Sequence, residues 1–315
     1  MTVVRIPKGQ LRKGMYVESV ECPQFVFSKR RFILDLDEDL DAIAAAPAEF
    51  VLVNTARSKG AMGAASSGKA NGNGDAPAQV DEVKRQKAAE TLTRSTAAVK
   101  TGFTGFATGD IKDIQAFAPV SRDLIESMSE GPEIVLELTR LKTKDEGTFL
   151  HSLAVGALMA SVGQALGYDE ATVELLGIAG ILHDFGKLLI PNMILNKRGS
   201  LSDVERQIIR NHPELGYQRL VTYPDMPGMV LDVCRHHHEL LDGSGYPQGL
   251  SGAALSPFVR ISTICDVYDA LTSTRPYKKA WSGQQAINWM FEQGHCFDRR
   301  LLLRLGEVTD GAGRG

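Results

Sequence analysis

Apolar residues in the second half of the chain recur every three to four positions, which is the spacing of an amphipathic helix. One series runs from His151 to Val162, so the imidazole of His151 shares the apolar face of its helix. The next series runs from Leu175 to Leu182 and ends directly before His183 and Asp184. Side chains that bind metals therefore lie on or beside faces that a folded chain buries.

Start and stop signals divide this half of the chain into further helices. Ser202 with Glu205, and Ser282 with Gln285, have the spacing of a capping box. Ser256 is followed by Pro257, which is the pattern of an N-cap residue with proline at the first helical position. On the apolar faces of the later helices lie His212, His237, His238 and Asp266. The C-terminal part is therefore expected to be all-helical.

The first half of the chain has a different pattern. Short β-branched runs at residues 3–6 and 51–53 predict strands. Residues 54–80 are rich in Gly, Ala, Ser and Asn, which is typical of a flexible linker. Three glycines within residues 101–110 predict a break between helices. The expected organisation is a small α+β domain at 1–53, a linker at 54–80, a helical connecting region at 81–142, a helical domain at 143–300 and a C-terminal tail at 301–315.

Composition narrows the classes of function. The chain has 315 residues, 43% of them hydrophobic, and a formal charge of −3, which argues against a general binder of nucleic-acid polymers or membrane surfaces. We find no signal-peptide pattern and no apolar run of the roughly 18 residues that a membrane span needs. The four cysteines are far apart in sequence, as is usual for reduced thiols. The protein is therefore expected to be cytoplasmic.

Histidines and aspartates on several helices predict a metal centre. A single histidine on an apolar helix face is usually an ordinary core residue, but five of the seven histidines and two aspartates together favour a functional site. Neighbouring residues on a helix point about 100° apart. The adjacent pairs His183–Asp184 and His237–His238 therefore suit two metal ions a few ångströms apart, bridged by a carboxylate. Mixed imidazole and carboxylate ligands favour Fe or Mn, and two such ions can activate a water for attack on a phosphodiester.

Residues 140–295 resemble the HD-GYP family. The motifs that carry this resemblance are H-D-F-G-K at 183–187, H-P at 212–213, H-H-E at 237–239, D-G-S-G-Y-P at 242–247 and the run from Asp266 to Lys278. The resemblance implies an all-helical HD-superfamily bundle in a mainly α chain. It also implies a phosphodiesterase that opens cyclic-di-GMP to pGpG, and in some members to GMP. Residues 1–53 resemble the small domain that often precedes this module.

The resemblance assigns roles to single residues. It implies metal ligands at His151, His183, Asp184, His212, His237, His238 and Asp266. Asp184 and Lys187 would be catalytic, and the substrate would be bound by Lys187, Tyr246, Arg275 and Lys278. Members with a third ion carry a glutamate four residues before the first histidine, where this chain has Gly147, so two ions are expected. The family usually extends further than this chain, so a poorly closed C-terminal edge is expected.

Two other functions stay open. One is another HD-superfamily nucleotide phosphohydrolase, and the other is a non-catalytic module that senses cyclic-di-GMP or docks a protein. The resemblance also leaves room for a diguanylate cyclase or other signalling protein bound at residues 242–247, and for a homodimer. Outside the ligand set, Glu239 is a candidate for orienting a ligand imidazole, and Asp269 for orienting a lysine or a ligand imidazole. His236 is expected in solvent or in contact with a ligand residue, and His295 at the surface.

Overall fold

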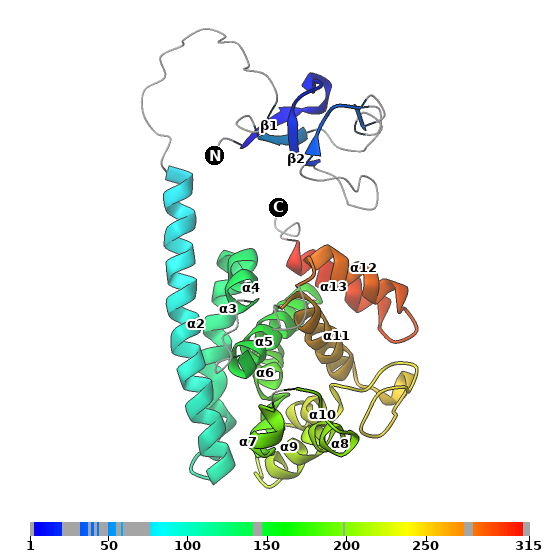
Figure 1. Cartoon of the computed structure of the whole chain (residues 1–315). Coiled ribbons are helices and arrows are strands. Elements are labelled where there is room, and N and C mark those ends of the chain that lie inside the picture. The colour runs from blue at the N-terminus through cyan, green and yellow to red at the C-terminus, as the bar shows by residue number, and fades with distance from the viewer. Residues whose placement is uncertain are drawn as a thin grey trace. The chain divides into compact units, whose positions relative to one another are not determined.

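The structure is a computed structural model of the whole chain. It describes residues 3–20, 32–36, 39–40, 43, 50–54, 58, 76–140, 147–197, 199–273 and 280–310. The chain divides into two compact units, residues 1–73 and 74–315, which are coloured along the sequence in Figure 1. The expectation of a mainly helical chain with a small α+β N-terminal domain is confirmed.

The N-terminal unit is built on a four-stranded antiparallel sheet. Its strands are β1 (Val3–Pro7), β2 (Tyr16–Val20), β3 (Phe32–Ile33) and β4 (Phe50–Asn54), and their order in the sheet is β1-β4-β2-β3. A short 3₁₀ helix, η1 (Lys8–Gln10), follows β1. Val51 and Val53 alternate along β4 onto one buried face and pack with Val17, Leu34 and Ile43. Strands therefore form where the sequence predicts them.

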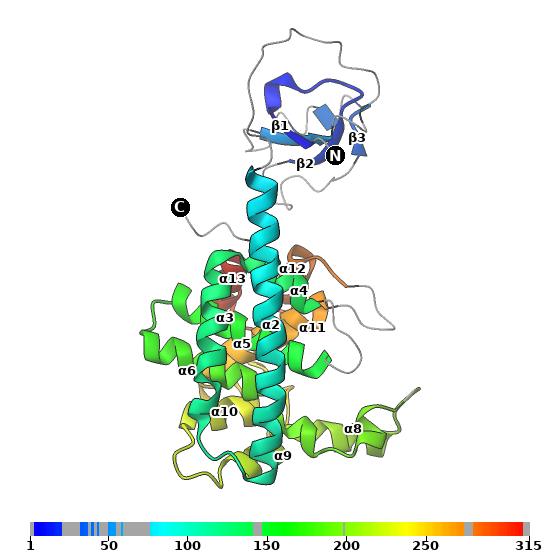
Figure 2. The ribbon, with the colours of Figure 1, turned by 90° about the vertical axis from the view of Figure 1, so that its left-hand side faces the viewer.

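The helical unit is organised around α5 (Gly147–Ala165) and α6 (Glu170–Leu182), most of whose residues are buried. Figure 2 shows the long helix α2 (Ala76–Thr108) along one side of this unit, where it contacts α3 (Ala118–Glu130), α4 (Pro132–Arg140) and α5. The later helices are α7 (Asn192–Leu195), α8 (Asp203–Arg210), α9 (His212–Leu220), α10 (Gly228–His236), α11 (Pro257–Thr272), α12 (Gly283–Glu292) and α13 (Arg299–Thr309). Three short 3₁₀ helices are η2 (Ile114–Phe117), η3 (Phe185–Leu189) and η4 (Gly252–Ala254).

The helix starts read from the sequence are confirmed. Both capping boxes form, at the beginnings of α8 and α12. The Ser256 hydroxyl accepts a hydrogen bond from the Val259 amide at the start of α11. These caps satisfy amides that the first helical turn leaves without partners, and so they determine where α8, α11 and α12 begin; of these helices, α11 carries Asp266.

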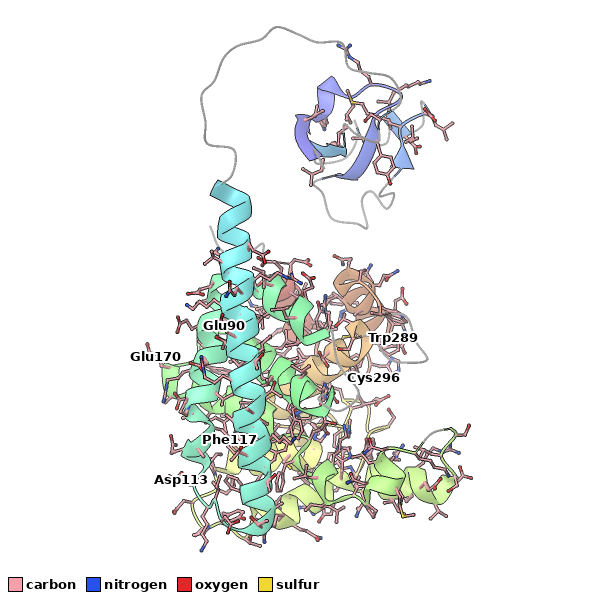
Figure 3. The ribbon with its side chains drawn as sticks, turned by 60° about the vertical axis from the view of Figure 1, so that its left-hand side comes forward. Glu90, Asp113, Phe117, Glu170, Trp289 and Cys296 are labelled. Atoms are coloured by element: carbon pink, nitrogen blue, oxygen red, sulfur yellow. The ribbon has the colours of Figure 1, made fainter. Side chains whose placement is uncertain are left out.

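The predicted break at residues 101–110 was wrong, because α2 continues to Thr108. The glycines serve close packing instead. A Cβ atom at Gly102 would lie 2.6 Å from the ring of Phe117, which is labelled in Figure 3, and one at Gly105 would lie 2.5 Å from Ile111. The predicted linker at 54–80 overlaps the first turn of α2, which begins at Ala76; its remaining residues lie almost entirely outside the described part of the chain.

The predicted tail at 301–315 was wrong for its first nine residues, which belong to α13. Leu301, Leu302 and Leu305 are buried there, and α13 contacts α5, α11 and α12. These contacts close the edge that was expected to be poorly closed. Residues 311–315 lie outside the described residues.

Among the described residues, one helix, α5, is long and apolar enough to cross a membrane by length and composition, although no such apolar run was predicted from the sequence. In the structure, 67% of its apolar window is buried inside the protein. A helix buried on all sides is apolar all round whether or not a membrane is present, and its place at the centre of the helical unit accounts for its composition.

Candidate metal centre

The seven predicted ligands come together from five helices. His151 is on α5, His183 and Asp184 lie between α6 and η3, and His212 begins α9. His237 and His238 follow α10, and Asp266 is on α11. These elements are neighbours in the helical unit, as Figure 1 shows for α5, α6, α9, α10 and α11.

The donor atoms form two groups, each within 4.8 Å. The first contains Asp184, His212, His237 and His238; the second contains His151, His183 and Asp266. In the first group, Asp184 Oδ1 lies 3.0 Å from His212 Nε2 and 3.6 Å from His237 Nε2. The sequence therefore predicted the ligand types, and the fold sorts them into two neighbouring sets.

Two carboxylates connect the groups. Asp184 Oδ2 faces the second group, 3.4 Å from His151 Nε2 and 3.5 Å from His183 Nε2. Asp266 also faces both ways, with Oδ1 3.2 Å from His151 Nε2 and Oδ2 3.5 Å from His238 Nδ1. Each carboxylate thus offers one oxygen to each group, which is the arrangement of a bridging ligand between two ions.

Hydrogen bonds set the imidazole tautomers. His183, His212 and His237 direct Nδ1 to backbone carbonyls, at 2.6 Å from Gly180 O, 2.8 Å from Ile209 O and 3.1 Å from Cys234 O. A ring that donates its Nδ1 proton keeps the Nε2 lone pair for a metal. In each of the three rings, Nε2 faces the centre.

His151 is oriented by a carboxylate instead. Its Nδ1 lies 2.6 Å from Asp269 Oδ2, and Asp269 is 2% exposed. Of the two residues considered for orienting an imidazole, Asp269 therefore does so. The same expectation was wrong for Glu239, whose carboxylate accepts hydrogen bonds from the Gln248 and Leu250 amides at 2.6 and 3.0 Å.

The arrangement fits divalent cations. His151 Nε2 lies 3.2 Å from His183 Nε2, and the same distance separates His212 Nε2 from His237 Nε2. Asp184 Oδ1 is buried with no hydrogen-bond partner. The unpartnered buried oxygen of Asp184, which faces the Nε2 atoms of His212 and His237, costs free energy unless a cation lies between them.

Protonation states agree with this fit. Burial lowers the pKa values of His212, His237 and His238, which favours the neutral, ligating form. Burial opposes the charge on Asp184, but Lys187 and the neighbouring histidines hold the pKa of this carboxyl well below its ordinary value. Burial also opposes charge on His151, yet the surrounding aspartates raise its pKa to about 10. Without a cation, this imidazole carries a proton that a metal ion would displace.

The predicted substrate residues are placed only in part. The Lys187 ammonium donates to Asp184 Oδ2 at the edge of the centre. The Tyr246 ring stacks on His238 with 4.6 Å between centroids, and Gly245 lets this loop pass close to residues 238–240, because a Cβ atom there would lie 2.4 Å from Glu239 Cα. Arg275 and Lys278 lie outside the described residues.

Sequence reasoning missed Arg210. Its guanidinium lies over the Tyr246 ring, 4.1 Å from the centroid, so a fixed cation stands beside the centre. The sequence offered one signal for Arg210: it lies at the end of α8, two residues before the candidate ligand His212. The two histidines expected outside the centre do lie elsewhere: His236 Nδ1 is 2.9 Å from Asp232 Oδ1, and the His295 side chain is 65% exposed.

Comparison with known proteins adds independent findings. Residues 124–301 match the HD domain family, and residues 3–138 match a domain of unknown function (DUF3391). A Pseudomonas aeruginosa protein named as a cyclic di-GMP phosphodiesterase is 38% identical over 95% of this chain and 74% of its own length. A Vibrio cholerae 3'3'-cGAMP-specific phosphodiesterase is 37% identical over 49% of this chain and 35% of its own length.

Similarity extends to a solved structure. An HDG"Y"P protein from Bdellovibrio bacteriovorus superposes with a TM-score of 0.56, covering 99% of this chain and 100% of that one, at 14% identity. At this level of identity the likeness concerns the fold alone. It shows that another chain has this overall fold.

Proposed function

Because this chain belongs to the HD-GYP branch of the HD domain family, we propose that it is a metal-dependent phosphodiesterase that hydrolyses cyclic-di-GMP. The relative from P. aeruginosa, which aligns with nearly the whole chain, supports the substrate. Hydrolysis to pGpG, and onward to GMP, would lower the concentration of a second messenger.

One observation carries this proposal: Asp184 and Asp266 each present one oxygen to each of two imidazole groups. This supports two divalent ions per chain. Imidazole and carboxylate donors without a thiolate favour Fe or Mn. Bound ions would lower the pKa of a water and stabilise negative charge on phosphoryl oxygens.

The chain's own residues would hold and orient the substrate. Lys187, next to Asp184, would meet a non-bridging phosphate oxygen as a point charge. Tyr246 is held between His238 and Arg210, so a guanine base would stack on its ring where the Arg210 guanidinium now lies, after that side chain moves aside. Arg210 adds a second cation, which an anionic substrate needs in a protein with a net charge of −3.

The remaining expectations are kept as part of the proposal. The protein would act in the cytoplasm, and residues 242–247 would offer a surface to a diguanylate cyclase or other signalling protein. The proposed activity is also compatible with a homodimer. The relative that acts on 3'3'-cGAMP favours a second candidate substrate, since the two cyclic dinucleotides differ in one base.

Metal analysis of protein purified without air, combined with product chromatography, tests the proposal. We expect about two ions per chain and conversion of cyclic-di-GMP to pGpG. Asp184→Asn should lower metal content and reduce turnover by more than about a hundredfold, since even outer-shell changes cost roughly 10–100-fold. His236→Ala is the matched control, because this imidazole binds Asp232 instead of the centre.

Three results would reject or redirect the proposal. Unchanged turnover in folded Asp184→Asn protein would contradict the role of the centre. Faster hydrolysis of 3'3'-cGAMP than of cyclic-di-GMP would favour the second substrate. Tight binding of cyclic-di-GMP by the metal-loaded protein, without product after hours, would identify a sensor instead of an enzyme.

A further inference from the structure

A third group of metal-binding side chains lies outside the centre. It contains Asp242, His295 and Cys296, whose donor atoms all lie within 4.8 Å of one another. Asp242 belongs to the loop that follows α10, and the other two residues lie in the turn between α12 and α13. In Figure 3, Cys296 is labelled on the same side of the unit as Trp289 of α12.

One oxygen of Asp242 faces both other donors. Asp242 Oδ2 lies 3.8 Å from His295 Nε2 and 3.6 Å from Cys296 Sγ. The other oxygen, Oδ1, accepts hydrogen bonds from the Ser244 amide at 3.0 Å and the Ser244 hydroxyl at 2.7 Å. The turn thus fixes the carboxylate so that Oδ2 points to the imidazole and the thiol.

These separations are close to those between ligands of one zinc ion. With bonds of about 2.0–2.3 Å at tetrahedral angles, neighbouring donor atoms lie about 3.3–3.6 Å apart. The distance of 3.6 Å from Cys296 Sγ to Asp242 Oδ2 lies within this range. The distance of 3.8 Å from His295 Nε2 to the same oxygen is slightly longer. Small side-chain rotations, which the exposed His295 can make, would close the difference.

The backbone already holds the two segments together. The Leu241 amide donates to the Cys296 carbonyl at 3.0 Å, directly beside two of the three donors. A cation would therefore find the two backbone segments already placed by the fold, and only the side chains would remain to be ordered. Because the His295 side chain is 65% exposed, water could reach a fourth coordination position.

We propose that Asp242, His295 and Cys296 form a zinc site that is separate from the centre at Asp184 and Asp266. A thiolate, an imidazole and a carboxylate together select a borderline-soft ion such as Zn²⁺, whereas the centre offers no thiolate among its predicted ligands. The ion binds as Zn²⁺, the Cys296 thiol becomes a thiolate, and one proton is released to solvent. No change of oxidation state is involved.

This site would clamp a loop that reaches the centre. Asp242 begins the segment that ends at Tyr246, whose amide donates to the His238 carbonyl at 3.1 Å and whose ring stacks on His238. Zinc would restrain the outer end of this segment while His238 restrains the inner end. The site itself does not depend on the proposed hydrolytic activity.

Cobalt(II) substitution tests the site. Full-length protein is first loaded with Mn²⁺ and then titrated with Co²⁺, and the thiolate-to-cobalt charge-transfer absorption is recorded in the near ultraviolet. We expect one equivalent of this signal, abolished by an added equivalent of Zn²⁺. Cobalt at the centre would not produce it, because the predicted ligands there contain no sulfur.

Variants assign the signal to its residues. Cys296→Ser should remove it and leave the Mn²⁺-supported turnover unchanged in zinc-free buffer. His295→Ala, a surface change that does not threaten folding, should weaken Co²⁺ binding by at least the roughly 10–100-fold that outer-shell changes cost. Cys22→Ser is the thiol control and should keep the full signal. No signal in the parent protein, or a signal that survives Cys296→Ser, would overturn the proposal, and so would unchanged binding in His295→Ala.

Discussion

Replacing Gly186 by alanine should disturb the candidate centre through the backbone. This residue lies in η3 between Asp184 and Lys187. A Cβ atom there would be 1.9 Å from the carbonyl oxygen of His212 and 2.7 Å from the amide nitrogen of Gly216. Both clashing atoms belong to the backbone of α9, so no side-chain rotation can relieve the contact.

The size of the effect follows from these distances. Ordinary contact begins at 3.4 Å, so α9 and η3 must separate by about 1.5 Å, the difference between 3.4 and 1.9 Å. Overpacking usually costs about 1–3 kcal/mol, and a backbone clash belongs at the upper end of this range, at about 3 kcal/mol. His212 Nε2 lies 3.0 Å from Asp184 Oδ1. The same displacement would move His212 away from Asp184 and should remove one of the two metal ions.

Urea unfolding and metal analysis measure both consequences. Trp281 and Trp289 are the two tryptophans of the chain, so their fluorescence reports on the helical unit. Gly306→Ala in α13 is the matched control: nothing lies within 4 Å of its added Cβ, and alanine should stabilise the helix by about 0.5–1 kcal/mol. If Gly186→Ala unfolds within about 0.5 kcal/mol of the parent and retains its metals, the packing argument is wrong.

Two further predictions concern single aspartates. Asp269→Asn should weaken Mn²⁺ binding by roughly 10–100-fold, measured by calorimetry, because His151 loses the carboxylate that orients it; an unchanged dissociation constant would contradict this role. Although burial opposes its charge, hydrogen bonds with His236 and Ser256 lower the pKa of Asp232. This contribution to stability is therefore present above the ordinary carboxyl pKa of about 3.9 and is lost as the pH falls through the lower folded-state value. Unfolding experiments from pH 6 to pH 3 should show a shallower loss of stability in Asp232→Asn, and parallel curves would refute the assignment.

The sequence by itself predicted most of the helices and the candidate metal ligands. Capping patterns located the starts of α8, α11 and α12 because they are local interactions among residues three positions apart. Histidines and aspartates on apolar stripes indicated a buried polar centre, since such side chains need partners when water is excluded. The family motifs then added the reaction.

Only the tertiary structure decided which of those residues contact one another. Periodicity places a residue on a helix face, but it does not say which side chain of another helix stands opposite. The division of the oxygens of Asp184 between two imidazole groups, the contact of Asp269 with His151 and the stacking of Arg210 on Tyr246 all join distant segments. The glycines of α2 were misread for the same reason: locally they favour a break, but the rings and side chains packed against them stabilise the continuous helix.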